Sequence, residues 1–235
     1  MTTGAEGVLR RDAELVQIVD AAFADAARRG GPHLVCRPGC TQCCYGAFAI
    51  NALDALRLRH AMGALSASDP ALAARIRERA HQYFAKFGSR FPGDPVTGIL
   101  DTSEAAQEAF EEFANEAPCP ALNPETGLCE VYEARPMTCR VFGPPVRAAA
   151  GDAEDNPEAE TEGLAVCELC FTEAMPEEIA AAEMLVPHAE EALLLQDLAN
   201  LGQASPSRET IDETGESSET IVAYCLIETP ATTVS

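Results

Sequence analysis

Cysteine is the residue type of this chain with the clearest capacity for chemistry. Nine of the ten cysteines fall into three groups, which are Cys36, Cys40, Cys43 and Cys44, then Cys119, Cys129 and Cys139, and finally Cys167 and Cys170. The C-x2-C spacing occurs twice, at Cys40/Cys43 and at Cys167/Cys170. The turn inside such a pair brings both sulfurs to one side, where they bind the same metal ion. We therefore predict that these nine cysteines are metal ligands.

The number and softness of these ligands limit the choice of metal. Nine thiolates exceed one tetrahedral site, so they fit two zinc sites or an iron–sulfur cluster with sulfurs to spare. Thiolates select zinc, copper(I) and iron–sulfur clusters, whereas magnesium and calcium need oxygen ligands. The neighbouring side chains of Cys43 and Cys44 diverge, so they serve two metal atoms, or one ligates while the other packs. The sequence leaves zinc and iron both open, and the surplus of sulfur favours an iron–sulfur centre slightly.

The charge of the chain argues against several classes of partner. Sixteen basic residues stand against 38 acidic ones, which gives a net charge of −22. Affinity for nucleic acids and anionic lipids comes mainly from Lys and Arg, so we expect no nucleic-acid partner and no membrane association. We find no apolar run of about 18 residues, and residues 1–11 lack the pattern of a signal peptide. We expect a cytoplasmic protein, whose reducing surroundings disfavour disulfides.

Apolar spacing and helix-start signals predict a mainly α fold, with four to six helices around an irregular cysteine-rich centre. Residues 15–26 carry apolar side chains at the period of one helical face, and the Gly-Gly-Pro sequence at 30–32 ends that helix. Asn51 is placed to cap a second helix, and the Ser-Asp-Pro sequence at 68–70 begins a third. Further helices are expected from residue 102 or 103 to 115 and, broken by Pro187, from 177 to 201.

Proline and glycine make the region from Cys119 to Pro145 irregular. Such a segment does not fold as long regular elements. We expect its cysteines to anchor it through the metal, because metal-binding energy is then folding energy. Residues 151–163 are rich in acidic side chains and predict a solvated loop.

The domain organisation follows from these patterns. We predict a metal-chelating domain over 1–202, with its core motif at 36–170, and a flexible tail rich in Ser, Thr and Glu over 203–235. One apolar run in the tail, residues 221–227, predicts a strand or a docking segment. Cys225 lies in this run and is expected to be a small buried hydrophobe.

Three arginines accompany the cysteines in an otherwise acidic chain, namely Arg37, Arg135 and Arg140. A metal bound by four thiolates carries net negative charge, so these cations would offset that charge or donate hydrogen bonds to sulfur. The alternative, weighted about equally for Arg135 and Arg140, is an ordinary surface position or pairing with a carboxylate. His33 precedes Cys36 by three positions and is a weaker ligand candidate.

Taken together, the motifs resemble those of a known family. CRPGCTQCC at 36–44, CPAL at 119–122 and GLCEVYEARPMTCRVFG at 127–143 are similar to the CxxCxxCC (YkgJ-like) proteins, described as zinc- or iron-chelating. The resemblance covers roughly residues 36–170 and implies metal binding by the cysteines. This chain has one extra residue between Cys36 and Cys40, which makes Cys36 a less certain ligand than Cys40, Cys43 and Cys44. Some members resemble flagellin lysine N-methylases.

Three functions are compatible with these observations. The first is a protein that holds zinc or an iron–sulfur centre for a structural, redox or metal-delivery role. The second is an iron–sulfur-dependent enzyme that methylates a protein lysine, which rests on the resemblance alone, since no Gly-rich turn after a strand marks a site for S-adenosylmethionine. The third is a zinc-folded module that binds an unidentified protein partner. No catalytic residue is assigned, and whether the chain is an enzyme stays open.

Overall fold

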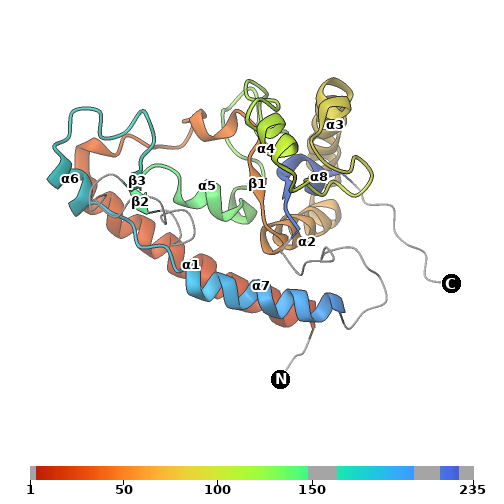
Figure 1. Ribbon diagram of the computed structural model, residues 1–235, viewed down its shortest axis with the longest axis horizontal. Coiled ribbons are helices and arrows are strands. Elements are labelled where there is room, and N and C mark those ends of the chain that lie inside the picture. Colours follow the sequence, from red (N-terminus) through yellow and green to blue (C-terminus); the bar gives the residue numbers. More distant parts are fainter. Residues whose placement is uncertain (1–3, 148–162, 204–217, 228–235) are drawn as a thin grey trace. The chain divides into compact units, whose positions relative to one another are not determined.

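The computed structural model describes residues 4–147, 163–203 and 218–227. These residues form eight α-helices and four strands of two residues each, so the predicted mainly α fold is confirmed (Figure 1). None of the helices in these ranges has the length and apolar character of a membrane span. The expected acidic loop at 151–163, apart from its last residue, and most of the expected tail at 203–235 lie outside the described residues.

The chain forms two compact units, and each unit combines two separate stretches of sequence. Unit 1 consists of Met1–Pro38 and Met137–Asp197, and unit 2 consists of Gly39–Pro136 and Leu198–Ser235. The chain therefore passes from one unit to the other inside the first cysteine group, between Cys36 and Cys40, and returns just before Cys139. The division into a domain over 1–202 and a tail over 203–235 stays a prediction.

Unit 1 is built on the long helix α1, which spans Ala5–Gly30. Its apolar stripe includes Leu15 and Val19, both of which are buried, as the spacing of apolar residues predicts. The helix ends where Gly31 takes a φ of 51°. Glycine adopts this left-handed conformation without the steric cost that a Cβ atom imposes.

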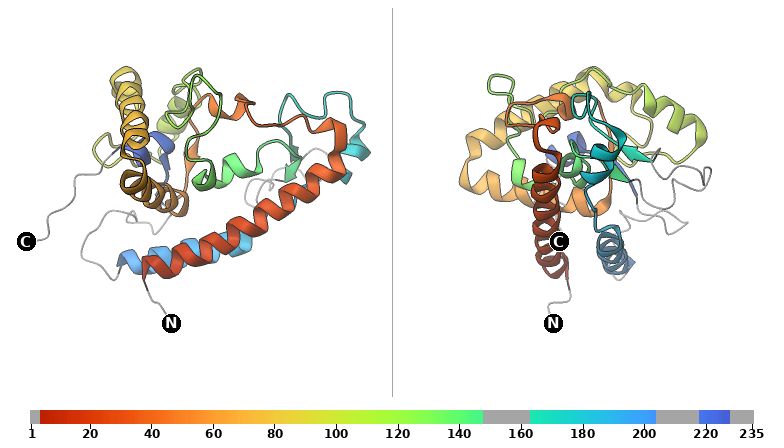
Figure 2. Two further views of the ribbon diagram at one scale, coloured as in Figure 1. Left: turned by 180° about the vertical axis from the view of Figure 1, so that it is seen from behind. Right: turned by 90° about the vertical axis from the view of Figure 1, so that its left-hand side faces the viewer.

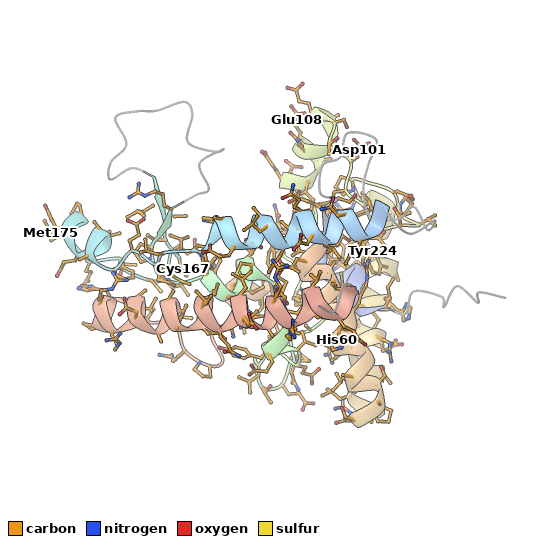
Figure 3. All side chains as sticks on the ribbon, turned by 90° about the horizontal axis from the view of Figure 1, so that it is seen from below. His60, Asp101, Glu108, Cys167, Met175 and Tyr224 are labelled. Carbon is orange, nitrogen blue, oxygen red and sulfur yellow. The ribbon has the colours of Figure 1, made fainter. Side chains whose placement is uncertain are left out.

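The other elements of unit 1 are shorter. They are the 3-10 turn Gly31–His33, helix α5 (Met137–Val141), strands β2 (Val146–Arg147) and β3 (Leu164–Ala165), and helices α6 (Pro176–Ala181) and α7 (His188–Gln203). Strands β2 and β3 pair in antiparallel fashion, with Val146 opposite Ala165. Helix α7, which begins in this unit, lies alongside α1, and Arg11 forms an ion pair with Asp197 (Figure 3).

Unit 2 is built on helices α2 and α3, and both begin where the sequence predicts. Helix α2 (Ala52–Ser68) starts at Asn51, whose side chain accepts hydrogen bonds from two backbone N–H groups of the first turn. Helix α3 (Pro70–Phe87) starts at Asp69, whose side chain accepts from the N–H of Leu72. Such caps satisfy backbone donors that have no partner within the helix.

The remaining elements of unit 2 are the 3-10 turns Gln42–Cys44, Gly88–Arg90 and Tyr132–Ala134, strands β1 (Ala49–Ile50) and β4 (Thr220–Ile221), and helices α4 (Glu104–Glu111) and α8 (Val222–Leu226). The apolar run at 221–227 supplies the last residue of β4 and all of α8, so the predicted strand is confined to its first residue and most of the run is helical. Strand β4 pairs with β1, with Ile221 opposite Ala49. Helix α8 is buried and packs against α2 and α3 (Figure 2). Cys225 is 1% exposed there, which confirms its place in the core.

Gly98 offers a sharp test of how α8 packs. Its φ is +76°, and a Cβ atom at this position would lie 2.4 Å from the Cγ atom of Tyr224. We expect Gly98→Ala to lower the free energy of unfolding by about 2–4 kcal/mol, from left-handed strain and overpacking together. Gly63→Ala is the matched control, because this site in α2 has nothing within 4 Å of the added atom and should gain about 0.5–1 kcal/mol. Urea unfolding measures the change in unfolding free energy of each variant. Equal changes in the two variants would contradict the close contact between Gly98 and Tyr224.

Candidate metal centre

Backbone hydrogen bonds join the first two cysteine-bearing stretches of unit 2. The 3-10 turn Gln42–Cys44 carries the vicinal pair Cys43 and Cys44. The N–H of Cys119 donates to the carbonyl of Cys44 at 2.7 Å, and Tyr45 pairs with Pro118 in an antiparallel bridge. The main chain therefore brings Cys119 beside the vicinal pair, although about 75 residues separate them in the sequence.

Cys129 returns toward Cys119 through a tight loop. Leu122 and Cys129 form an antiparallel bridge. Between them, the side chain of Asn123 accepts hydrogen bonds from two backbone N–H groups, a turn typical of asparagine. At the tip, Gly127 has a φ of +69° and lies against the first stretch, since a Cβ there would be 3.3 Å from the carbonyl oxygen of Gly39. Cys40, the next residue after Gly39, is thus next to this loop.

Two side chains hold this segment on helix α3, and no sequence motif marks them. Arg79 donates from Nε to the carbonyl of Pro120 at 2.7 Å and forms an ion pair with Glu130. Glu130 also accepts a hydrogen bond from the side chain of Asn123 at 2.9 Å. The proline-rich segment therefore has anchors in addition to its cysteines, and the expectation that the cysteines also anchor it through a metal stays a prediction.

Four thiols of unit 2 interact electrostatically with one another, namely Cys43, Cys44, Cys119 and Cys129. A hydrogen bond from the Cys44 thiol lowers the pKa of Cys43 to about 7, and the same bond, followed by burial, raises the pKa of Cys44 far above its usual range. Burial raises the pKa of Cys119 to about 12 and also raises the pKa of Cys129. Ionising several of these thiols at once is unfavourable unless a cation joins them.

Arg135 contributes positive charge at this cluster. Its charge lowers the pKa of Cys43, as a smaller effect than the Cys44 hydrogen bond, and lowers that of Cys129 against the dominant effect of burial. The guanidinium carbon lies 3.8 Å from the centre of the Tyr132 ring, a cation–π arrangement. Arg135 therefore places positive charge near these two thiols, and its role in offsetting the charge of a metal–thiolate site stays a prediction.

Arg140 follows the alternative interpretation and pairs with a carboxylate. Its side chain is 1% exposed, and Nη1 donates to Oδ1 and Oδ2 of Asp20 in α1 at 2.9 and 3.0 Å. Arg37 is exposed. The ring of His33 stacks on Phe171, with the ring centres 5.9 Å apart, and its Nε2 atom lies 3.7 Å from a carboxylate oxygen of Glu178.

The other four predicted ligands, Cys36, Cys139, Cys167 and Cys170, lie in unit 1. Cys36 is exposed, Cys139 is half-buried on α5, and Cys167 and Cys170 are buried (Cys167 is labelled in Figure 3). The first cysteine group of the sequence is therefore divided, with Cys36 in one unit and Cys40, Cys43 and Cys44 in the other. The structure sorts the nine predicted ligands by unit instead, five in unit 2 and four in unit 1.

All ten cysteines lie within the described residues, and none forms a disulfide. Across the same part of the chain, no group of three or more Cys, His, Asp or Glu side chains has the close spacing of ligands around one ion. The four interacting thiols of unit 2 are neighbours, but they do not have the spacing of ligands around a bound metal. Which cysteines ligate therefore stays a prediction.

Alkylation tests the pKa of Cys43 directly. In metal-stripped protein at pH 7, iodoacetamide should label Cys43 faster than Cys119 and Cys129, because only a thiolate reacts and the hydrogen bond from Cys44 lowers the pKa of Cys43 to about 7. Its rate should fall tenfold per pH unit below the pKa and level off above it. Cys119, with its pKa raised to about 12, should react far more slowly. Mass spectrometry of the labelled peptides gives both rates. Equal labelling of Cys43 and Cys119 at pH 7 would contradict the lowered pKa of Cys43 and the raised pKa of Cys119.

Comparison with known protein families shows which family this sequence matches. A family model named CxxCxxCC, with the description "putative zinc- or iron-chelating domain", matches residues 35–170. The matched region is more than half of the chain and contains all nine predicted ligands. No curated protein and no solved structure shows a significant match. The chain belongs to the CxxCxxCC family of zinc- or iron-chelating domains.

Proposed function

We propose that this chain is a metal–thiolate protein whose unit 2 holds zinc or an iron–sulfur centre through Cys40, Cys43, Cys44, Cys119 and Cys129. The observation that carries the proposal is the mutual interaction of four of these thiols, which come from stretches far apart in the sequence. A backbone hydrogen bond and an antiparallel bridge join these stretches, and Arg79 holds the second stretch on α3. The family description supports metal chelation.

The ligand chemistry limits what is bound. Thiolates are soft ligands, which favours zinc or iron–sulfur clusters over magnesium and calcium. Five thiols in one unit exceed a tetrahedral site by one, and the vicinal pair supplies the extra sulfur. In a zinc site one of Cys43 and Cys44 would remain a hydrogen-bond donor to the other, whereas a cluster with several irons has a place for both.

Metal and acid-labile sulfide analysis of protein purified without oxygen tests the proposal. Iron with matching sulfide and visible absorption would identify a cluster, and redox titration would follow. Zinc without sulfide would identify a thiolate site, and a search for protein partners would follow. Protein that carries neither metal, and takes up neither when reconstituted, would refute the proposal. The methylase interpretation stays a prediction, and binding of S-adenosylmethionine by the reconstituted protein is its test.

A further inference from the structure

We propose that Cys167 and Cys170 of unit 1 are a reversible disulfide site, which a small disulfide such as oxidised glutathione converts from two thiols to one S–S bond. The inference goes beyond the proposed function, because it involves neither a metal ion nor any cysteine of unit 2. Both residues carry free thiols in the structure. Where the surroundings are reducing, the disulfides that do form are usually transient, with a catalytic or redox-sensing role.

The backbone holds the two cysteines at a separation that suits a disulfide. The N–H of Cys170 donates to the carbonyl of Cys167 at 2.8 Å, which closes a four-residue turn with Glu168 and Leu169 at its centre. The Cα atoms at the two ends of such a turn lie less than about 7 Å apart. A disulfide joins Cα atoms that are about 4.4–6.8 Å apart, so this turn is compatible with the bond.

The side chains of both cysteines lie in the same apolar interior. Cys167 and Cys170 are 9% and 4% exposed, whereas Glu168 and Leu169 between them are exposed. Both cysteines belong to one hydrophobic cluster of unit 1. A disulfide suits such a cluster, because its formation removes two S–H groups, which are weak hydrogen-bond donors.

The residue after the pair fixes the end of the turn. Phe171 has a φ of +56°, a conformation that a residue with a Cβ atom keeps only where its surroundings impose it. Its N–H donates to the carbonyl of His33 at 2.8 Å, and its ring lies against Gly30, where an added Cβ would be 2.8 Å from Cζ. These contacts involve no sulfur atom, so the fold itself keeps the two thiols near each other before any disulfide forms.

The oxidation is a thiol–disulfide exchange in two steps. The thiolate of one cysteine attacks a sulfur of oxidised glutathione, which forms a mixed disulfide and releases one glutathione thiolate. The second cysteine loses its proton and attacks the cysteine sulfur of the mixed disulfide, which forms the S–S bond and releases the second glutathione. The two cysteines give up two electrons and two protons, which the two glutathione molecules take up. Burial disfavours the bulky, charged mixed disulfide, so it favours the second step.

The fold and the disulfide should stabilise each other by the same factor. The folded chain already holds the turn closed, whereas the unfolded chain must lose conformational freedom to close it. The equilibrium constant for disulfide formation should therefore be larger in the folded protein, by about tenfold or more for a short loop. Because linkage is reciprocal, the disulfide should raise the equilibrium constant for folding by the same factor.

Equilibration with glutathione tests the inference on the full chain, stripped of metal because a metal ion on these two sulfurs would block the exchange. Buffers with different ratios of reduced to oxidised glutathione are quenched with acid, free thiols are alkylated, and mass spectrometry maps each disulfide. We expect a Cys167–Cys170 disulfide that dithiothreitol reverses, with an equilibrium constant about tenfold or more above that of the same pair in urea. Urea unfolding of the oxidised and the reduced protein measures the reciprocal effect on folding.

Two variants and three outcomes decide the matter. Cys167→Ser should remove the cross-link, whereas Cys225→Ala, a core change in unit 2, should leave its equilibrium constant unchanged. The inference is overturned if Cys167 and Cys170 stay reduced in the folded protein in buffers that oxidise them in urea, or if either pairs with another cysteine instead. Equal equilibrium constants in folded and unfolded protein would also overturn it, because the fold would then not position the thiols. None of these results bears on metal binding by unit 2.

Discussion

Replacing Cys129 by serine is expected to lower the affinity of unit 2 for its metal more than about 100-fold. The purified variant should therefore lack this metal. Loss of a group that only supports a ligand already costs 10–100-fold, and a serine hydroxyl is a poor replacement for a soft thiolate. Metal binding and folding are coupled in such sites, so the melting temperature of the variant in excess metal should fall toward that of metal-stripped protein. Metal analysis and thermal unfolding measure the two effects.

Cys225→Ala is the control for this substitution, because Cys225 is buried in the core with a pKa that burial raises to about 11. It should keep its full metal content despite a small loss of stability. Arg79 and the backbone bond from Cys119 to Cys44 still hold the segment in the serine variant, so unit 2 should retain its helices. Full metal and full thermal stability in Cys129→Ser would show that the segment is not anchored by metal.

The features that the sequence predicts well are those encoded by neighbouring residues. The caps at Asn51 and Asp69 lie where their side-chain chemistry and the following residues place them, because a cap needs only partners two or three residues away. The secondary structure of residues 221–227 is harder to predict, because a short apolar segment is equally compatible with a strand, a helix or a docking segment. Pairing with β1 and burial on α2 and α3 decide that it forms β4 and α8.

The arrangement of the candidate site depends on contacts that sequence spacing does not contain. Spacing groups Cys36 with Cys40, yet the chain changes units between them. Arg140 pairs with Asp20, which is 120 residues away in the sequence. The residues around Arg140 therefore do not indicate that it binds a carboxylate and not a thiolate. The same is true of Arg79 and Glu130, which are 51 residues apart. The sequence identifies candidate ligands, whereas the fold decides which of them meet.

The second large effect is expected from Asp54→Asn in α2. Asp54 and Arg57 form an ion pair at 2.6 Å whose side chains are only 2% and 8% exposed. Removing one charge from a buried pair leaves the other poorly compensated in a medium that solvates it badly, which costs about 3–5 kcal/mol. Urea unfolding of the metal-loaded protein should show this loss. Asp25→Asn, which weakens the exposed pairs with Arg28 and Arg29 in α1, should cost under about 1 kcal/mol.

This substitution also tests whether the buried pair supports the thiol cluster. Arg57 donates to the backbone carbonyl of Arg135 at 3.3 Å, and Arg135 supplies the positive charge near Cys43 and Cys129. Asp54→Leu combined with Arg57→Leu should recover most of the lost stability, because apolar side chains replace buried ion pairs at little cost. The double variant should still bind metal more weakly than the unchanged protein, because the backbone carbonyl of Arg135 no longer accepts a hydrogen bond from Arg57. Recovery of stability together with unchanged metal affinity would show that the pair supports the helix alone.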